Sequence, residues 1–161
     1  MLRRMTIDLA DTLSALYILS AGPLAGIVLS EHVLILPLVR SSEPDRGVAT
    51  LRFAGARAWK LAPTFGATAG ISGTAVVALW PWQGFPPAAA FTVAGVVLFL
   101  AAVAVTFAVY YPVDARFRTL SPVTAPTDGP RTINQLIRRN LVRLSLYAGG
   151  FALFAVGVVL T

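Results

Sequence analysis

Charged residues are missing from three long stretches of this chain, and this spacing restricts the fold more than any other feature. Fifty-three residues without a charge separate Lys60 from Asp114, nineteen separate Asp11 from Glu31, and the last eighteen residues are also uncharged. A membrane-spanning helix needs about 20 mostly apolar residues in succession. The stretches therefore predict transmembrane helices, and the longest one has room for two.

The composition excludes an ordinary soluble domain. Of the 161 residues, 57% are hydrophobic and 12% are charged, whereas soluble domains carry roughly 25% charged residues. A small soluble domain buries only about two-thirds of the surface that its unfolded chain exposes, so it could not hide this much apolar side chain. We therefore expect a single integral membrane domain of the all-α class, spanning residues 1–161.

The hydropathy pattern predicts a bundle of four transmembrane helices, at about 10–37, 61–80, 87–111 and 136–159. A short interfacial amphipathic helix is expected at 51–60, and a long polar link at 112–135. A cleaved signal peptide is the competing interpretation of the first stretch, but Glu31 and His32 and the apolar residues after them argue against it. Gly22-x-x-x-Gly26, Gly66-x-x-x-Gly70 and Gly149-Gly150 indicate small-residue faces for helix packing.

Basic residues gather on two links of the predicted bundle. Arg40, Arg46, Arg52, Arg57 and Lys60 lie on the first link, and Arg116, Arg118, Arg131, Arg138 and Arg139 lie on or beside the second. Only Arg3 and Arg4 fall on the other side. Because cytoplasmic loops are rich in Lys and Arg, we expect both links in the cytoplasm of a multi-pass cell-membrane protein, with both termini outside. The net charge of +6 then reports topology and predicts no nucleic-acid partner.

The count of metal-binding and nucleophilic residues excludes several kinds of site. The chain has no cysteine, which excludes disulfides, thiolate nucleophiles and iron–sulfur ligation. A single histidine, His32, argues against a multi-histidine metal centre or a bis-histidine haem, and the two methionines give little support to copper. A metal held mainly by carboxylates stays open, although we expect no metal and no other cofactor.

Ionisable residues within predicted spans are the functional candidates, because they are costly to insert into a membrane. Glu31 and His32 lie near the end of the first helix and are followed by an apolar run. The simpler alternative is a helix-end pair that reaches the interface. In the fourth helix, Asn140 and Arg143 are three residues apart and share one face, deeper than Arg138 and Arg139.

The four-helix topology brings these candidates to one end of the bundle. We expect a catalytic group, His32, Glu31, Asn140, Arg143 and Asp114, with Trp59, Tyr110 and Tyr111 as substrate-binding residues. Histidine is the side chain whose ordinary pKa lies nearest neutrality. Such a set can remove a proton from an apolar, enolisable substrate and stabilise the resulting oxyanion.

The chain resembles the anthrone oxygenase-like family of small membrane proteins, and the resemblance covers most of its length. The resemblance rests on the first helix from Gly26 to His32, on Pro112-Val113-Asp114, and on Asn140-Leu-Val-Arg143. Family members often have a His-Pro step, a Pro-x-Asn motif and a tryptophan before the Asn-x-x-Arg motif. Here valine follows His32, Asp114 holds the asparagine position, and the tryptophan is missing.

The resemblance implies an enzyme that tailors aromatic polyketide natural products, a monooxygenase (oxidoreductase) that converts an anthrone to an anthraquinone with O2 and no recognised cofactor. It implies His32 as the base and Arg143 with Asn140 as the groups that stabilise the anion. Two alternatives stay open: a membrane cyclase or isomerase that needs no O2, with Glu31 or Asp114 as the proton donor, and a non-catalytic transport or cofactor-handling protein. The expected partners are a lipophilic substrate and the bilayer, and homo-oligomerisation is left open.

Overall fold

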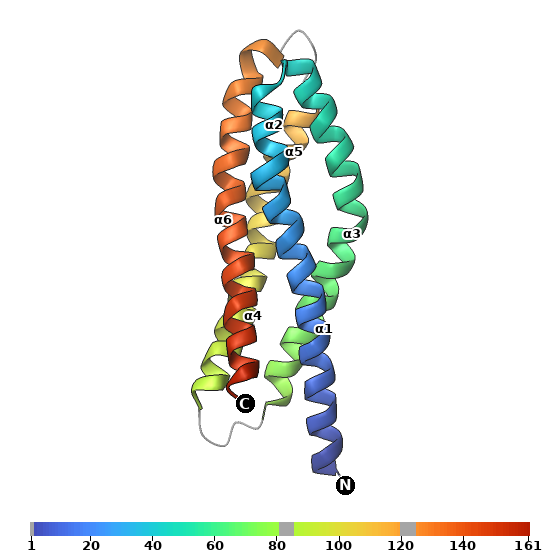
Figure 1. The fold of residues 1–161 in the computed structure, drawn as a ribbon, viewed down its shortest axis with the longest axis vertical. Coiled ribbons are helices and arrows are strands. Elements are labelled where there is room, and N and C mark those ends of the chain that lie inside the picture. Colours follow the sequence, from blue (N-terminus) through green and yellow to red (C-terminus); the bar gives the residue numbers. More distant parts are fainter. Residues whose placement is uncertain (1, 81–85, 120–124) are drawn as a thin grey trace.

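The computed structural model describes residues 2–80, 86–119 and 125–161, apart from the side chains of residues 2–8, 44, 59, 118 and 125–127. In this part of the chain every element is helical (Figure 1). The elements are α1 (Leu2–Ser30), η1 (Glu31–Ile35), α2 (Leu36–Ser41), α3 (Pro44–Leu79), α4 (Pro87–Val105), η2 (Thr106–Tyr110), α5 (Tyr111–Arg118) and α6 (Ala125–Val159). The two η segments are π-helices that continue the α-helices on either side. The chain therefore forms four long helical rods, with its two termini at the same end (Figure 1).

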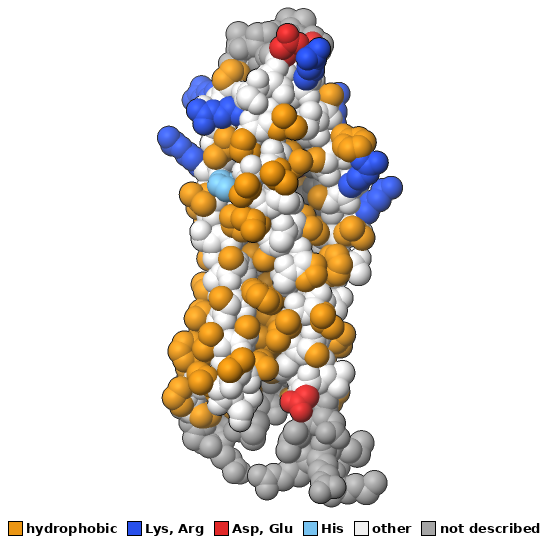
Figure 2. All heavy atoms as spheres, viewed as in Figure 1, with side chains coloured by type: hydrophobic (Ala, Val, Ile, Leu, Met, Phe, Trp, Pro, Cys, Tyr) orange, Lys and Arg blue, Asp and Glu red, His pale blue; other side chains and the backbone are white. Residues whose placement is uncertain are grey.

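Among the described residues, four helical stretches are long and apolar enough to cross a membrane: Leu9–Ser41, Lys60–Leu79, Pro87–Phe117 and Asp128–Val159. Large apolar side chains face outward along them, and Leu19 and Ile71 are 68% and 71% exposed. Figure 2 shows hydrophobic side chains over most of one face, with Lys and Arg gathered toward one end. The predicted all-α membrane bundle is confirmed.

The short amphipathic helix predicted at 51–60 is helical, but it does not end before the second span, because these residues belong to the continuous helix α3. Much of the link predicted at 112–135 is also helical, in α5 and the first turns of α6. The polar segments stay helical because one face of each is buried in a second core, made of Leu36, Val39, Val48, Leu51, Tyr110, Val113, Phe117, Ile133 and Leu136. With 36 residues, α3 is about 54 Å long, whereas the hydrocarbon layer of a bilayer is only about 30 Å thick.

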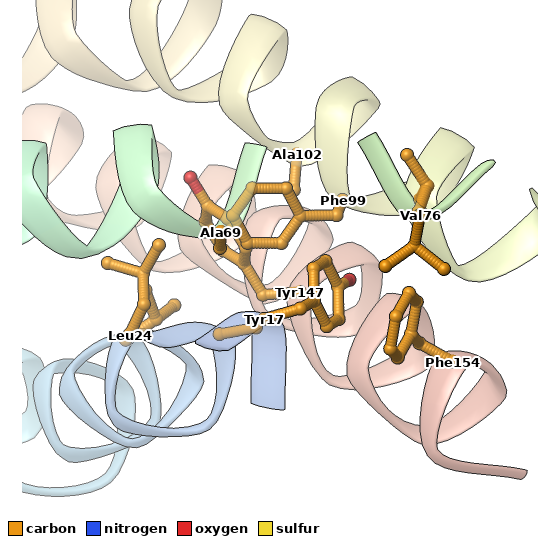
Figure 3. Packing of buried hydrophobic residues seen from close by; sticks show 11 residues of the cluster. Tyr17, Leu24, Ala69, Val76, Phe99, Ala102, Tyr147 and Phe154 are labelled. Atoms are coloured by element: carbon orange, nitrogen blue, oxygen red, sulfur yellow. The ribbon is translucent and has the colours of Figure 1, made fainter. Parts of the chain in front are cut away.

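The larger core lies in the half of the bundle nearer the termini and is built around aromatic rings (Figure 3). Tyr17 stacks on Phe154 with ring centroids 3.8 Å apart and meets Phe99 edge-on at 5.6 Å. Phe99 in turn meets Tyr147 edge-on at 5.4 Å. Gly73 makes room for the first of these rings, since a Cβ there would lie 2.7 Å from Cδ2 of Tyr17.

Glycine also allows α4 and α6 to pack backbone against backbone. A Cβ on Gly95 would lie 2.6 Å from the backbone nitrogen of Phe154, and one on Gly150 would lie 2.9 Å from the carbonyl oxygen of Gly95. By contrast, a Cβ on Gly26 would meet nothing within 4 Å. Of the glycines noted in the sequence, Gly150 therefore supports close packing, whereas Gly26 does not.

Candidate functional site

A cavity of about 320 Å³ lies between α3 and the helices α1, α4, η2 and α6. Among the described side chains, the side of the cavity formed by α3 consists of small residues and one proline: Gly55, Ala58, Ala62, Pro63, Gly66 and Ala67. Residues three and four apart share one face of a helix, so this series forms a stripe, the small face of α3. The described side chains of this face are too short to fill the cavity.

Polar groups occupy one end of the cavity. Arg143 of α6 forms an ion pair with Glu31, the first residue of η1. The hydroxyl of Tyr110, the last residue of η2, donates to Oε1 of Glu31 at 2.9 Å, and Cζ of Arg143 lies 3.9 Å from the centre of the Tyr110 ring. All three residues line the cavity, and Arg143 is only 6% exposed. The carboxylate and the guanidinium compensate each other's charge, as buried charges require.

A second polar pair lines the cavity one helical turn away. The hydroxyls of Thr106 and Tyr147 lie 3.2 Å apart, and Thr106 also donates to the carbonyl of Ala102 at 2.7 Å. Thr106 precedes Tyr110 by four residues and Tyr147 follows Arg143 by four, so each lies on the cavity-facing side of its helix. The rest of the wall is apolar and includes Leu24 and Phe107.

Both π-helices end two residues before a proline. Pro37 follows η1 and Pro112 follows η2, each six residues after the first residue of the π-helix. Proline cannot donate a backbone hydrogen bond, and its ring crowds the carbonyl of the preceding turn. A widened turn relieves this crowding, and such turns are frequent at functional sites. The two prolines thus account for the local geometry of the helices that carry Glu31 and Tyr110.

Helix α6 holds the backbone near both π-helices through side-chain donors. Arg139 donates to the carbonyl of Val109 at 2.8 Å, and the amide nitrogen of Asn140 donates to the carbonyl of Val28 at 3.4 Å. With the ion pair of Arg143, these contacts link one short stretch of α6 to α1, η1 and η2. This stretch of α6 fixes where Glu31 and Tyr110 lie relative to each other.

The structure brings together only part of the predicted site. Glu31, Arg143 and Tyr110 meet at the cavity, as described above. Asn140 and Asp114 are buried, at 0% and 1% exposure, but do not line the cavity. Tyr111 is 45% exposed on the surface. The side chain of Trp59, which was predicted to bind substrate, lies outside the described residues.

His32, the predicted base, does not line the cavity either. Successive residues of a helix point about 100° apart, so when Glu31 faces the cavity, its neighbour faces elsewhere. The side chain is half-buried, and its Nδ1 atom has no hydrogen-bond partner among the described residues. The sequence could not decide which of the two adjacent residues faces the interior.

Sequence reasoning missed Thr106, Tyr147 and the small face of α3. The sequence spacing of the first two could have indicated them, because Thr106 lies four residues before Tyr110 and Tyr147 lies four residues after Arg143. The small face could have been predicted from Gly55, Ala58, Ala62 and Gly66, because these small residues recur every three or four positions. Within the described part of the chain, no group of three or more His, Asp or Glu residues could hold a metal ion.

Comparisons with known proteins identify no relative: no family model, no curated protein and no solved structure matches this chain. A functional argument therefore starts from the cavity and its polar end.

Proposed function

We propose that the protein is a membrane enzyme that binds a lipophilic, enolisable aromatic molecule in the cavity and removes a proton from it, as a cofactor-free oxygenase acting on an anthrone-like substrate. The observation that carries the proposal is the cluster of Glu31, Arg143 and Tyr110 at one end of an otherwise mainly apolar cavity. A mainly apolar pocket with a few convergent polar groups is typical of small-molecule sites, and about 300 Å³ is within their usual size range.

The position of the cavity opening supports a substrate that arrives from the lipid. Pro63, Ala67 and Phe107 line the cavity and are also exposed on the molecular surface. All three belong to candidate membrane spans, Lys60–Leu79 and Pro87–Phe117. A hydrophobic molecule dissolved in the bilayer can therefore enter between α3 and η2 without crossing water.

In the proposed reaction Glu31 is the base. Its carboxylate takes the proton from the carbon next to the substrate carbonyl, and the negative charge moves to the substrate oxygen. Arg143 contacts Glu31 and lines the same cavity, so its guanidinium can stabilise the charge before and after the transfer. The hydroxyl of Tyr110 can donate to the same oxygen. This assignment replaces His32, the base implied by the family resemblance, with a residue that faces the cavity.

O2 is the second substrate in this proposal. The electron-rich carbon of the enolate is oxidised as it bonds to one oxygen atom of O2, and uptake of a proton gives a hydroperoxide. The remaining hydrogen on this carbon then leaves as a proton while the O–O bond breaks. The released hydroxide takes up a proton to give water, and a second carbonyl remains on the ring. One atom of O2 thus ends in the quinone and the other in water.

Turnover of anthrone by purified protein in lipid vesicles tests this proposal. We expect Glu31→Gln to reduce the rate at least 100-fold and His32→Gln to leave it within a few-fold of the unchanged protein. Glu31→Asp keeps the charge for Arg143 and should retain intermediate activity, which separates loss of the base from loss of folding. Loss of turnover in His32→Gln with full activity in Glu31→Gln would overturn the assignment.

The contact between Tyr110 and Glu31 favours a second candidate, a cyclase or isomerase. A phenol hydroxyl 2.9 Å from a carboxylate supplies an acid and a base to one substrate, and such reactions need no O2. Product formation under strict anoxia would favour this candidate over the oxygenase.

We also propose an orientation for the bundle. The described parts of both segments rich in Arg and Lys, around 40–60 and 112–139, lie toward the end away from the termini (Figure 1). The bias of positive residues toward the cytoplasm supports placing this end inside the cell and both termini outside. The polar end of the cavity then lies nearer the cytoplasm.

A further inference from the structure

The face of α3 opposite the cavity carries both exposed apolar and exposed basic residues. Phe53, Arg57, Lys60 and Leu61 recur at intervals that place them on one side of the helix, and all four are exposed. We call these four residues the outer strip. The guanidinium carbon of Arg57 lies 3.7 Å from the centre of the Phe53 ring. This stacking partly orders an arginine that faces outward.

The two basic residues of the outer strip lie near the depth of the lipid headgroups. Lys60 is the last charged residue before the uncharged stretch 61–113, so we take it as the approximate boundary of the hydrocarbon layer. At a rise of 1.5 Å per residue, Arg57 lies about 5 Å and Phe53 about 10 Å beyond this boundary along the helix axis. The headgroup layer extends roughly 5–8 Å from the hydrocarbon on each side of a bilayer. The guanidinium and the ammonium therefore fall where phosphates of phospholipids lie.

No described acidic residue balances these two cations. Arg57 and Lys60 form no ion pair with a described residue. Glu43 and Asp128 lie near Arg46 and Arg116, at 3.7 and 3.9 Å, while Glu31 pairs with Arg143 inside the bundle. The outer strip thus has uncompensated positive charge at headgroup depth.

We propose that the outer strip is a binding site for the phosphate headgroup of an anionic phospholipid. A guanidinium can donate two hydrogen bonds to one phosphate, Lys60 adds a second charge, and Leu61 lies where the acyl chains begin. Phe53 stacks on the guanidinium of Arg57. The same helix carries the small face of the cavity on its other side, so a bound lipid fixes the helix that forms the cavity wall. The proposal does not depend on the catalytic function.

Native mass spectrometry of the protein with phosphatidylglycerol or phosphatidylcholine tests the site. Each basic residue near a membrane surface strengthens binding of anionic lipid about fivefold. We therefore expect Arg57→Gln with Lys60→Gln to weaken phosphatidylglycerol binding at least tenfold and to leave phosphatidylcholine binding unchanged. Phe53→Leu keeps both charges and should weaken phosphatidylglycerol binding only a few-fold.

Arg46→Gln is the matched control, because Arg46 is an exposed arginine of the same helix that lies beside Glu43. It should leave phosphatidylglycerol binding unchanged. The proposal is overturned if the double variant, with unchanged helix content, binds phosphatidylglycerol as tightly as the unchanged protein. It is also overturned if Arg46→Gln weakens phosphatidylglycerol binding as much as the double variant does. Displacement of the lipid by equimolar inorganic phosphate would also contradict a lipid site.

Discussion

Among individual residues, Glu31 and Arg143 matter most to the site, because the charge of each buried side chain is compensated by the other. Both are largely buried, with 16% and 7% of their side-chain surface exposed. A charge in this environment loses its hydration, and removal of one partner of a buried pair leaves the other uncompensated. Tyr110 adds a hydrogen bond to Glu31 and a ring face to Arg143.

A double-mutant cycle measures this mutual dependence. We expect Arg143→Met to lower the free energy of unfolding by about 3–5 kcal/mol. Adding Glu31→Gln removes the orphaned charge, so the double variant should recover about 2 kcal/mol of that loss. Unfolding in mixed micelles monitored by helix content provides the measurement. Additive effects of the two single variants would show that the pair contributes no coupling.

Glu31 and Arg143 could be predicted from the sequence as residues of the candidate site, because ionisable residues within apolar stretches are rare. Tyr110 was also expected, although tyrosines at helix ends are ordinary interfacial residues. The direction of His32 could not be predicted. One residue of helix rotation separates a cavity-facing side chain from one outside the cavity, and the π-helix that begins at Glu31 changes that rotation locally.

At the scale of elements, the positions of the helices followed from the sequence but their lengths did not. Hydropathy detects the segments within the bilayer, whereas α3 continues through polar residues because its inner face, including Val48 and Leu51, packs on the second core. Contacts between distant segments cannot be seen in a local pattern. The prolines behind η1 and η2 were visible in the sequence, but a proline is compatible with a kink, a break or a widened turn.

The packing of α4 on α6 gives a second prediction. Gly95→Ala would force a methyl group against the backbone of α6, at 2.6 Å from the nitrogen of Phe154. We expect it to lower the free energy of unfolding by about 1–3 kcal/mol. Gly26→Ala is the matched control, since a Cβ there meets nothing within 4 Å, and better helix propensity should leave stability unchanged or raise it by up to about 1 kcal/mol.

Thermal unfolding of both variants in the same detergent provides the comparison. Equal stability of the two alanine variants would contradict the close approach of α4 and α6.

At the scale of the whole molecule, the bundle is longer than the bilayer, and the described Lys and Arg side chains gather toward one end (Figure 2). The sequence predicted this separation of charge because it depends only on the order of apolar and basic segments. It could not predict the cavity, which depends on how far the small face of α3 stands from α1 and α4. Such distances are set by the packing of all four rods.

The orientation can be tested directly because the chain has no cysteine. A single cysteine at Ser42, which follows α2, should react in intact cells only with a membrane-permeant maleimide. A single cysteine at Thr161, at the other end, should also react with an impermeant reagent. The reverse pattern would invert the proposed topology and leave the fold unchanged.

Binding of anthrone under anoxia is the measurement closest to the central claim, since it separates recognition in the cavity from the reaction with O2. We predict saturable binding of one anthrone per protein in lipid nanodiscs. Ala62→Phe, which fills the cavity from the small face of α3, should abolish it, and Thr64→Phe, on the exposed side of the same helix, should not. Equal binding by all three proteins would contradict a ligand site between α3 and the Glu31–Arg143 pair.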